Sequence, residues 1–280
     1  MARTRPKPER IETADRVEVL GVGVDPLRVE ELGDRVLQLV RQEKTGAGPS
    51  LVLNVNAHSL NLARREKGLR RILDSAEVVF ADGAGVVLAA KMAGGYLPER
   101  ITYADWAWTL AQLAEREGLS LYLLGGRPGV AERASTKLLE KYPNLEIAGT
   151  QHGYFDPTHS GRENQKIVEE INAVRPDLLL VGLGMPLQEQ WLLDNLYDLE
   201  ARVALNCGAA FDYVSGELER GPRVLTDNGF EWLARLAIEP GRLWRRYLIG
   251  NPLFLARATN AAIKKRLGGE GPGLRKEPRP

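Results

Sequence analysis

The chain has 280 residues, of which 44% are hydrophobic and 27% are charged, a composition that excludes wholesale disorder and can form one sizeable core. Residues 1–219 hold 25 Lys and Arg against 32 Asp and Glu, a net charge of −7, whereas residues 220–266 hold 10 against 3, a net charge of +7. This asymmetry predicts an anionic partner for the C-terminal part, and the single cysteine, Cys207, excludes an intramolecular disulfide and fits a reducing compartment.

The N-terminus is polar and lacks the apolar core of a secretory signal. No stretch approaches the ~20 consecutive apolar residues that a transmembrane helix needs. We therefore expect a cytoplasmic protein whose contact with a membrane, if any, is peripheral. Residues 1–15 and 267–280 are rich in Pro, Gly and charge, and are predicted to be disordered tails.

Between the tails, short apolar runs alternate with amphipathic stretches. Strands are predicted at residues 16–25, 51–56, 77–83, 119–126, 145–150, 177–184 and 202–208. Helices are predicted from Pro26 to about Glu43, from Ala57 onward, and at residues 85–93, 128–142, 160–174 and 186–199. From Asn228 the pattern becomes wholly helical.

Apolar runs without alternation, separated by helices, are typical of a parallel sheet that is covered on both faces. We predict an α/β protein with a Rossmann-like α/β/α sandwich and a mostly parallel sheet over residues 16–219. A basic, amphipathic helical appendage is predicted over residues 220–266.

The segments that follow the predicted strands are polar or rich in glycine, as in Asn54-Val55-Asn56, Ala81-Asp82-Gly83, Gly182-Leu183-Gly184 and Asn206-Cys207-Gly208. Ligands of open α/β sheets bind at this edge, where helix N-termini favour phosphate. A nucleotide is the natural occupant, although glycines after strands also serve simply as tight turns. The segment GVGVDP at residues 21–26 matches the dinucleotide fingerprint only in part, and the phosphate-loop pattern is absent.

Asp82 is the carboxylate that we single out, because it ends an apolar strand and precedes Gly83-Ala84-Gly85. It could act as a general base toward an acceptor hydroxyl, or it could cap the next helix. Asn54 and Asn56 could likewise be caps or turn residues, and Arg100 a solvated surface charge. With one cysteine and only His58, His152 and His159, neither a metal site nor a cofactor is expected.

Several motifs together resemble the WecG/TagA/CpsF glycosyltransferase family. They are ADGAGVVLAAK (81–91), the LLGG-x-PG stretch (123–129), VGLGMPLQEQW (181–191), CGAAFDYVSGELERGP (207–222) and EWLARLAIEPGRLWRRYLIGNPLFL (231–255). The resemblance covers roughly residues 17–260, with the motifs in the family's order.

The resemblance implies an inverting, metal-independent transferase at the cytoplasmic face of the membrane. The donor would be UDP-N-acetylmannosamine, its uronic acid or another UDP-sugar such as UDP-glucose. The acceptor would be undecaprenyl diphosphate carrying N-acetylglucosamine, an intermediate of wall teichoic acid or enterobacterial common antigen. A homo-oligomer is left open.

The resemblance also implies roles for single residues. Asp82 would be the general base, Arg100 would assist the leaving diphosphate or orient the sugar, and Gln188 would contact the sugar nucleotide in a pocket lined by Asn56. Many members have a Thr where this chain has Asn54, so the identity of the donor sugar is put in doubt.

The resemblance implies that the appendage closes over the site and that its arginines meet the diphosphate, although they could also form a solvated basic face. The segment offers Arg235, Arg242, Arg245 and Arg246, of which the site is predicted to use Arg235, Arg242 and Arg245. The spacing of these last three, seven and three residues, places them on one helical face if the helix continues through Pro240-Gly241. Pro240 and Pro252, however, predict breaks into several short helices. Aromatic and basic residues interleave here, which suits an anionic membrane surface as well as packing onto the body.

Two other classes of protein compete with this interpretation. A nucleotide-binding oxidoreductase would use the same scaffold, but the incomplete fingerprint at residues 21–26 argues against it. A nucleic-acid-binding module would use the basic C-terminus, but that segment is dominated by Leu, Trp and Phe and has no recognised reader motif, so no nucleic-acid partner is expected.

Overall fold

A computed structural model describes residues 15–43, 48–222, 226, 229 and 231–268. The predicted tails, residues 1–15 and 267–280, fall outside the described residues except at Asp15 and at residues 267–268. The division of the chain at residue 219 into a body and an appendage stays a prediction.

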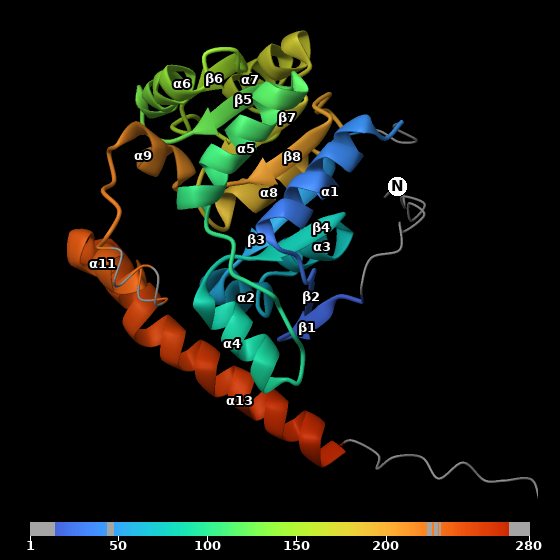
Figure 1. The fold of residues 1–280 in the computed structure, drawn as a ribbon, viewed down its shortest axis with the longest axis vertical. Coiled ribbons are helices and arrows are strands. Elements are labelled where there is room, and N and C mark those ends of the chain that lie inside the picture. Colours follow the sequence, from blue (N-terminus) through green and yellow to red (C-terminus); the bar gives the residue numbers. More distant parts are fainter. Residues whose placement is uncertain (1–14, 44–47, 223–225, 227–228, 230, 269–280) are drawn as a thin grey trace, which may run out of the picture.

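The body is built on a six-stranded parallel sheet of order β4-β3-β8-β7-β5-β6 (Figure 1). Its strands are β3 (Ser50–Val55), β4 (Val78–Ala81), β5 (Ser120–Gly125), β6 (Glu146–Gln151), β7 (Leu178–Gly182) and β8 (Val203–Asn206). Five of the six are buried almost throughout, which is why they lack hydrophobic alternation in the sequence. The predicted Rossmann-like sandwich is confirmed.

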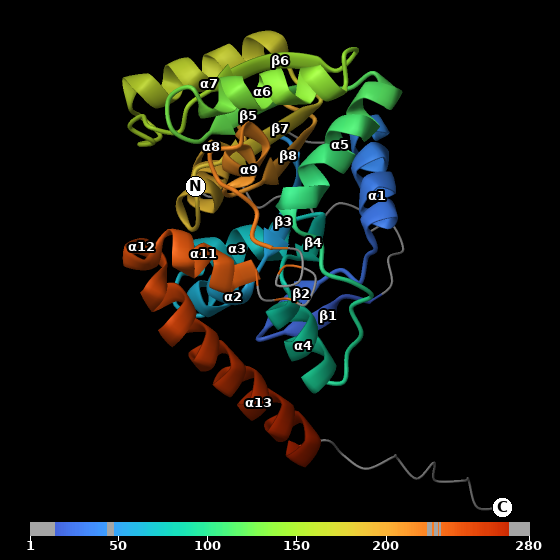
Figure 2. The ribbon, with the colours of Figure 1, turned by 60° about the vertical axis from the view of Figure 1, so that its left-hand side comes forward.

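Helices cover both faces of this sheet (Figures 1 and 2). One buried cluster contains side chains of α2 (Ala57–Ala63), α3 (Lys67–Ser75), α4 (Ala84–Met92), α7 (Arg162–Val174) and α8 (Leu187–Asn195). The other contains side chains of α1 (Val29–Arg41), α5 (Tyr103–Glu117), α6 (Val130–Lys141) and α9 (Ala210–Ser215). Each face of the sheet therefore has its own core.

The segment at residues 16–25 is a hairpin and not the single strand that its apolar run predicts. Its strands β1 (Val17–Val19) and β2 (Val22–Val24) pair antiparallel outside the main sheet. The turn residues Leu20 and Gly21 both have positive φ, 52° and 89°. This is the backbone of a two-residue hairpin loop whose twist matches the flanking strands.

Helix α5 is an element that the sequence analysis leaves unassigned. Its buried residues recur with helical spacing, and it ends at Gly118 in the left-handed conformation, with φ of 65°. A glycine just after the last helical residue is a common stop signal that could have identified this helix.

The C-terminal segment consists of α11 (Glu231–Ile238), α12 (Pro240–Trp244), the π-helical turn η1 (Arg245–Ile249) and α13 (Gly250–Gly268). The helix does break before Pro240, because Glu239 leaves the helical region, with φ of −128° and ψ of 57°. The predicted break at Pro252 is wrong. The helical backbone continues from η1 into α13 and passes through Pro252 without a break.

Helix α13 lies along α2 and α4 (Figures 1 and 2). Phe254 is only 1% exposed, and Ala258 and Ala262 are buried at the same helical spacing. Burial of a phenylalanine contributes about 2–3 kcal/mol. Phe254 and Ala258 thus belong to the same buried cluster as the body. None of the described helices combines the length and the apolar content needed to cross a bilayer.

Candidate active site

The polar residues singled out in the sequence gather at the carboxyl ends of β3, β4, β7 and β8. Asp82 directly follows β4, and its backbone N–H donates to the carbonyl oxygen of Val55 at 2.8 Å. Gly83, with φ of 99°, then turns the chain into α4 and is itself the N-cap. Asp82 is therefore not a helix cap, and its carboxyl group is left for another role.

Burial is the main influence on the Asp82 carboxyl and raises its pKa to about 7. The carboxylate of Glu231 raises this pKa further, whereas Arg246, Arg235 and a hydrogen bond from Asn56 lower it. A carboxyl that exchanges its proton near neutral pH suits a general base. Three of these neighbours belong to the C-terminal segment, so α11 and η1 face the edge of the sheet at which Asp82 lies.

Asn54 and Asn56 flank Asp82 from the end of β3. Nδ2 of Asn54 lies 3.4 Å from Oδ2 of Asp82, and Oδ1 of Asn54 is buried without a hydrogen-bond partner among the described residues. Asn56 caps α2, because its Oδ1 accepts from the N–H groups of His58 and Ser59. Asn56 thus does cap a helix, while its Nδ2 faces Sδ of Met185 at 3.7 Å. Both asparagines lie close to Asp82, and their contact with a sugar nucleotide stays a prediction.

Gln188 is fully buried in the first turn of α8. Its Oε1 accepts from the N–H groups of Gly184 and Gly208, at 3.2 and 3.1 Å, and its Nε2 donates to Glu189 at 2.7 Å. In this arrangement Gln188 holds together the two glycine loops that follow β7 and β8. Direct contact with a sugar nucleotide stays a prediction.

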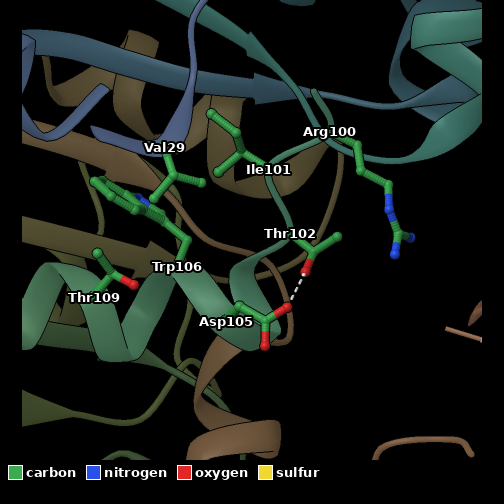
Figure 3. Close-up of a pocket in the computed structure, with 7 residues that line it drawn as sticks. All are labelled: Val29, Arg100, Ile101, Thr102, Asp105, Trp106 and Thr109. Atoms are coloured by element: carbon green, nitrogen blue, oxygen red, sulfur yellow. Dashed lines mark hydrogen bonds between the residues drawn. The ribbon is translucent and has the colours of Figure 1, made fainter. Parts of the chain in front are cut away.

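Nη2 of Arg100 donates to the carbonyl oxygen of Thr226, which precedes α11 in the chain. Figure 3 shows its side chain extending away from Thr102, Asp105 and Trp106, with which it lines a small cavity. Its predicted role toward the leaving diphosphate stays a prediction.

The predicted arginines do not share one continuous helix, because the chain breaks at Glu239. Arg235 and Arg242 both approach the Glu239 carboxylate, at 3.7 and 2.7 Å. Arg235 is largely buried and lies over the ring of Tyr213 at 5.6 Å, whereas Arg242 is exposed. Arg245 is also exposed and stacks on Trp244 at 5.2 Å.

Arg246 is one of the arginines of the C-terminal segment, but helical spacing did not select it as a site residue. Its charge acts on Asp82 and also helps to lower the pKa of His58 to about 4, an effect in which burial is the larger cause. Nε of Arg246 is buried without a hydrogen-bond partner in the described part of the chain. The π-helical turn shifts the helical register here, so that Arg246 is turned toward the site while Arg245 is exposed. A periodicity of 3.6 residues gives no sign of such a shift.

Known proteins resemble this chain over most of its length. The family model described as "Glycosyl transferase WecG/TagA/CpsF family" matches residues 17–268. Similar proteins include N-acetylglucosaminyldiphosphoundecaprenol N-acetyl-beta-D-mannosaminyltransferase of Staphylococcus aureus strain MRSA252 and the same enzyme of strain NCTC 8325 / PS 47. Each is 27% identical over 256 residues, which cover 91% of this chain and 96% of the relative.

Proposed function

The chain belongs to the WecG/TagA/CpsF glycosyltransferase family, and on that premise we propose that it transfers N-acetylmannosamine from a UDP-sugar to N-acetylglucosaminyl-diphosphoundecaprenol. The acceptor and the transferred sugar are those in the names of its S. aureus relatives. The UDP carrier and inversion at the anomeric carbon are further parts of the proposal.

The observation that carries the proposal is the position of Asp82 at the tip of β4, with a pKa raised to about 7. Its carboxylate takes the proton of the acceptor hydroxyl, whose oxygen then attacks the anomeric carbon of the donor sugar. The bond from that carbon to the UDP oxygen breaks, and UDP leaves with the electron pair. A single displacement of this kind needs one base and no carboxylate nucleophile. Glu231, the other nearby carboxylate, accepts a hydrogen bond from the Tyr213 hydroxyl at 3.2 Å.

Departing UDP gains negative charge, which guanidinium groups held in a dry site stabilise strongly. Arg235 and Arg246 are the arginines whose charges act on Asp82, and both are largely withdrawn from solvent. These two supply the positive field over the leaving group, and contacts of Arg100, Arg242 and Arg245 with the diphosphate are further parts of the proposal. No metal is required in this scheme, so chelation with EDTA is expected to leave turnover intact.

A polyprenyl acceptor is embedded in a membrane, so the enzyme has to bind the membrane surface to reach it. The C-terminal segment carries exposed residues that favour such binding. Trp244, Leu248 and Ile249 are exposed by 42%, 55% and 54%, and Arg242 and Arg245 lie among them. Apolar and aromatic side chains enter the headgroup region while arginines meet anionic lipid. We propose peripheral binding at the inner face of the plasma membrane through this surface.

The decisive experiment offers a panel of UDP-sugars, with a short-chain polyprenyl-diphosphate-GlcNAc acceptor, to the purified protein and identifies products by mass spectrometry. The expected product carries one added N-acetylhexosamine from UDP-N-acetylmannosamine. Because Asn54 stands where many members have Thr, UDP-glucose and UDP-N-acetylmannosaminuronate belong in the panel. A product formed only from one of these two would replace the proposed donor, and an Asp82→Asn variant that turns over normally would remove the proposed base.

A further inference from the structure

Glu189 is a fully buried carboxyl group that the proposed mechanism does not use. It lies on α8 beside Gln188 and makes no ion pair within the described part of the chain. Two amide groups, Nδ2 of Asn206 and Nε2 of Gln188, both donate to its Oε1 at 2.7 Å. Burial raises the pKa of Glu189, and these two hydrogen bonds lower it. Burying a carboxyl group without a cationic partner costs free energy of folding. We therefore asked what Glu189 contributes in return.

The first reason lies in Asn206, at the end of β8. An amide side chain can be turned by 180° without changing its shape, and only its partners fix its orientation. Because Oε1 of Glu189 accepts, Nδ2 of Asn206 has to face it. Oδ1 of Asn206 is then directed at the backbone N–H of Asn54, which donates to it at 2.6 Å.

Asn206 in turn extends the pairing of β3 with β8. Their backbone register ends at Val52 and Leu205, two residues before Asn54. The Asn206 side chain takes over from the backbone, since it accepts from the Asn54 N–H and donates to the Asn54 carbonyl oxygen at 3.3 Å. This side chain fixes the tip of β3, and the tip carries the Asn54 amide that faces Asp82.

The second reason lies in Gln188, whose amide is oriented by the same oxygen of Glu189. With Nε2 directed at Glu189, Oε1 of Gln188 faces the N–H groups of Gly184 and Gly208. One buried acceptor therefore sets the orientation of two amides. One amide holds the strand tip beside Asp82, and the other holds the glycine loops.

We propose that Glu189 is a positioning residue for the transfer reaction, which through Asn206 fixes Asn54 against Asp82 and through Gln188 fixes the loops after β7 and β8. The inference rests on the proposed role of Asp82 as the base. Glu189 itself touches neither substrate nor the reacting atoms.

The test compares Glu189→Met, which has no acceptor, with Glu189→Gln, whose oxygen can accept both amide donors. In Glu189→Met we expect kcat to fall by about tenfold or more while the KM for the donor changes by less than about threefold, because misplacement affects chemistry more than binding. The acid limb of the kcat/KM profile should move to higher pH, since Asn54 no longer donates to the Asp82 carboxylate. Glu189→Gln should restore most of the rate and the position of the limb.

A matched control is Asn195→Leu, on the same helix. Asn195 is equally buried and joins Asn164 and the carbonyl oxygen of Trp191, at 2.7 and 2.9 Å, far along α8 from Glu189. It should lower thermal stability without moving the acid limb. If Glu189→Met does not fold, Asn206→Ala removes the same link and should produce the same shift.

The outcomes separate this inference from the function on which it rests. A wild-type profile without a limb near neutral pH would remove Asp82 as the base, and the inference with it. A limb that is present in wild type, absent in Asp82→Asn and unmoved in Glu189→Met or Asn206→Ala would overturn the positioning role alone.

Discussion

Arg257 on α13 donates from Nη1 to Oδ1 of Asn61 on α2, at 2.6 Å. Nδ2 of the same Asn61 donates to the carbonyl oxygen of Gly250 at 2.8 Å, so one amide of the body holds α13 at two points. Gly250 directly follows the π-helical turn that carries Arg246. The hydrogen bonds between Asn61 and α13 therefore help to fix the position of Arg246 at the site.

Asn61→Ala should loosen α13 by about 1–3 kcal/mol, because it leaves a guanidinium and a carbonyl oxygen without their partner. Hydrogen exchange of the α13 amides should accelerate, and the transfer rate should fall as Arg246 loses its position. Lys265→Ala is the control, since Lys265 makes only an exposed contact with the Ala93 carbonyl oxygen. Equal exchange rates in both variants would show that Asn61 does not secure the helix.

The activity should depend on pH through Asp82. Its carboxylate is the active form and its pKa is about 7, so kcat/KM should rise as pH increases through neutrality and level off above it. Glu231→Gln removes a charge that raises this pKa, and should move the limb to lower pH. Asp82→Asn should reduce kcat by about 10²–10⁴-fold and abolish the limb while UDP binding persists. Initial rates of UDP release give kcat and kcat/KM at each pH. An acid limb that keeps its position in Glu231→Gln would contradict its assignment to Asp82.

The same pKa makes a prediction for stability. A carboxyl whose pKa is raised in the folded state stabilises the fold only while it is protonated, and this contribution is lost as pH rises from about 4 through about 7. Above pH 7 the carboxyl is charged in both states, but this charge is buried in the folded protein and solvated in the unfolded chain. Asp82→Asn should therefore have a higher Tm than wild type at alkaline pH, and the difference should vanish at acid pH. A Tm difference that is independent of pH would exclude this origin.

Arg245 and Arg246 form a matched pair, since they are neighbours with the same side chain but different exposure. Arg246→Met should move the acid limb to higher pH, because the positive charge that lowers the pKa of Asp82 is gone. It should also reduce kcat by about tenfold more than Arg245→Met does, as expected for a charge held in a dry site. If Arg245→Met instead reduces kcat more than Arg246→Met does, Arg245 is the arginine that stabilises the leaving group, as the sequence had predicted.

The sequence predicted the parts of the molecule that depend on local pattern. Unbroken apolar runs located the six strands of the sheet, and their order along the chain placed Asp82, Asn54 and Asn56 at one edge. Parallel strands force this convergence, so it can be inferred without coordinates. The hairpin at Leu20-Gly21 was missed because its turn needs two positive φ angles, and Leu gives no warning of one.

What the sequence could not provide were relationships that depend on tertiary packing. The π-helical turn at Arg245–Ile249 leaves no mark on the hydrophobic periodicity, so the effect of Arg246 on Asp82 could not be predicted. Glu189 and Gln188 stand in a recognisable motif, but their burial and their shared link to Asn206 are visible only in three dimensions. Such contacts join residues far apart in the chain, which periodicity does not report.

Membrane binding should depend on the exposed apolar residues of η1. Replacing both Leu248 and Ile249 by Ser should weaken co-sedimentation with anionic liposomes by about tenfold or more, since each side chain contributes about 1.5–3 kcal/mol when fully buried in lipid. Binding of UDP in solution should be unaffected, because both side chains are exposed to solvent. Val174→Ser, on α7, removes another exposed apolar residue, from outside the C-terminal segment, and should bind liposomes normally. If the double variant sediments like wild type, the acceptor reaches the site by another surface, because the apolar face of η1 then has no role in lipid contact.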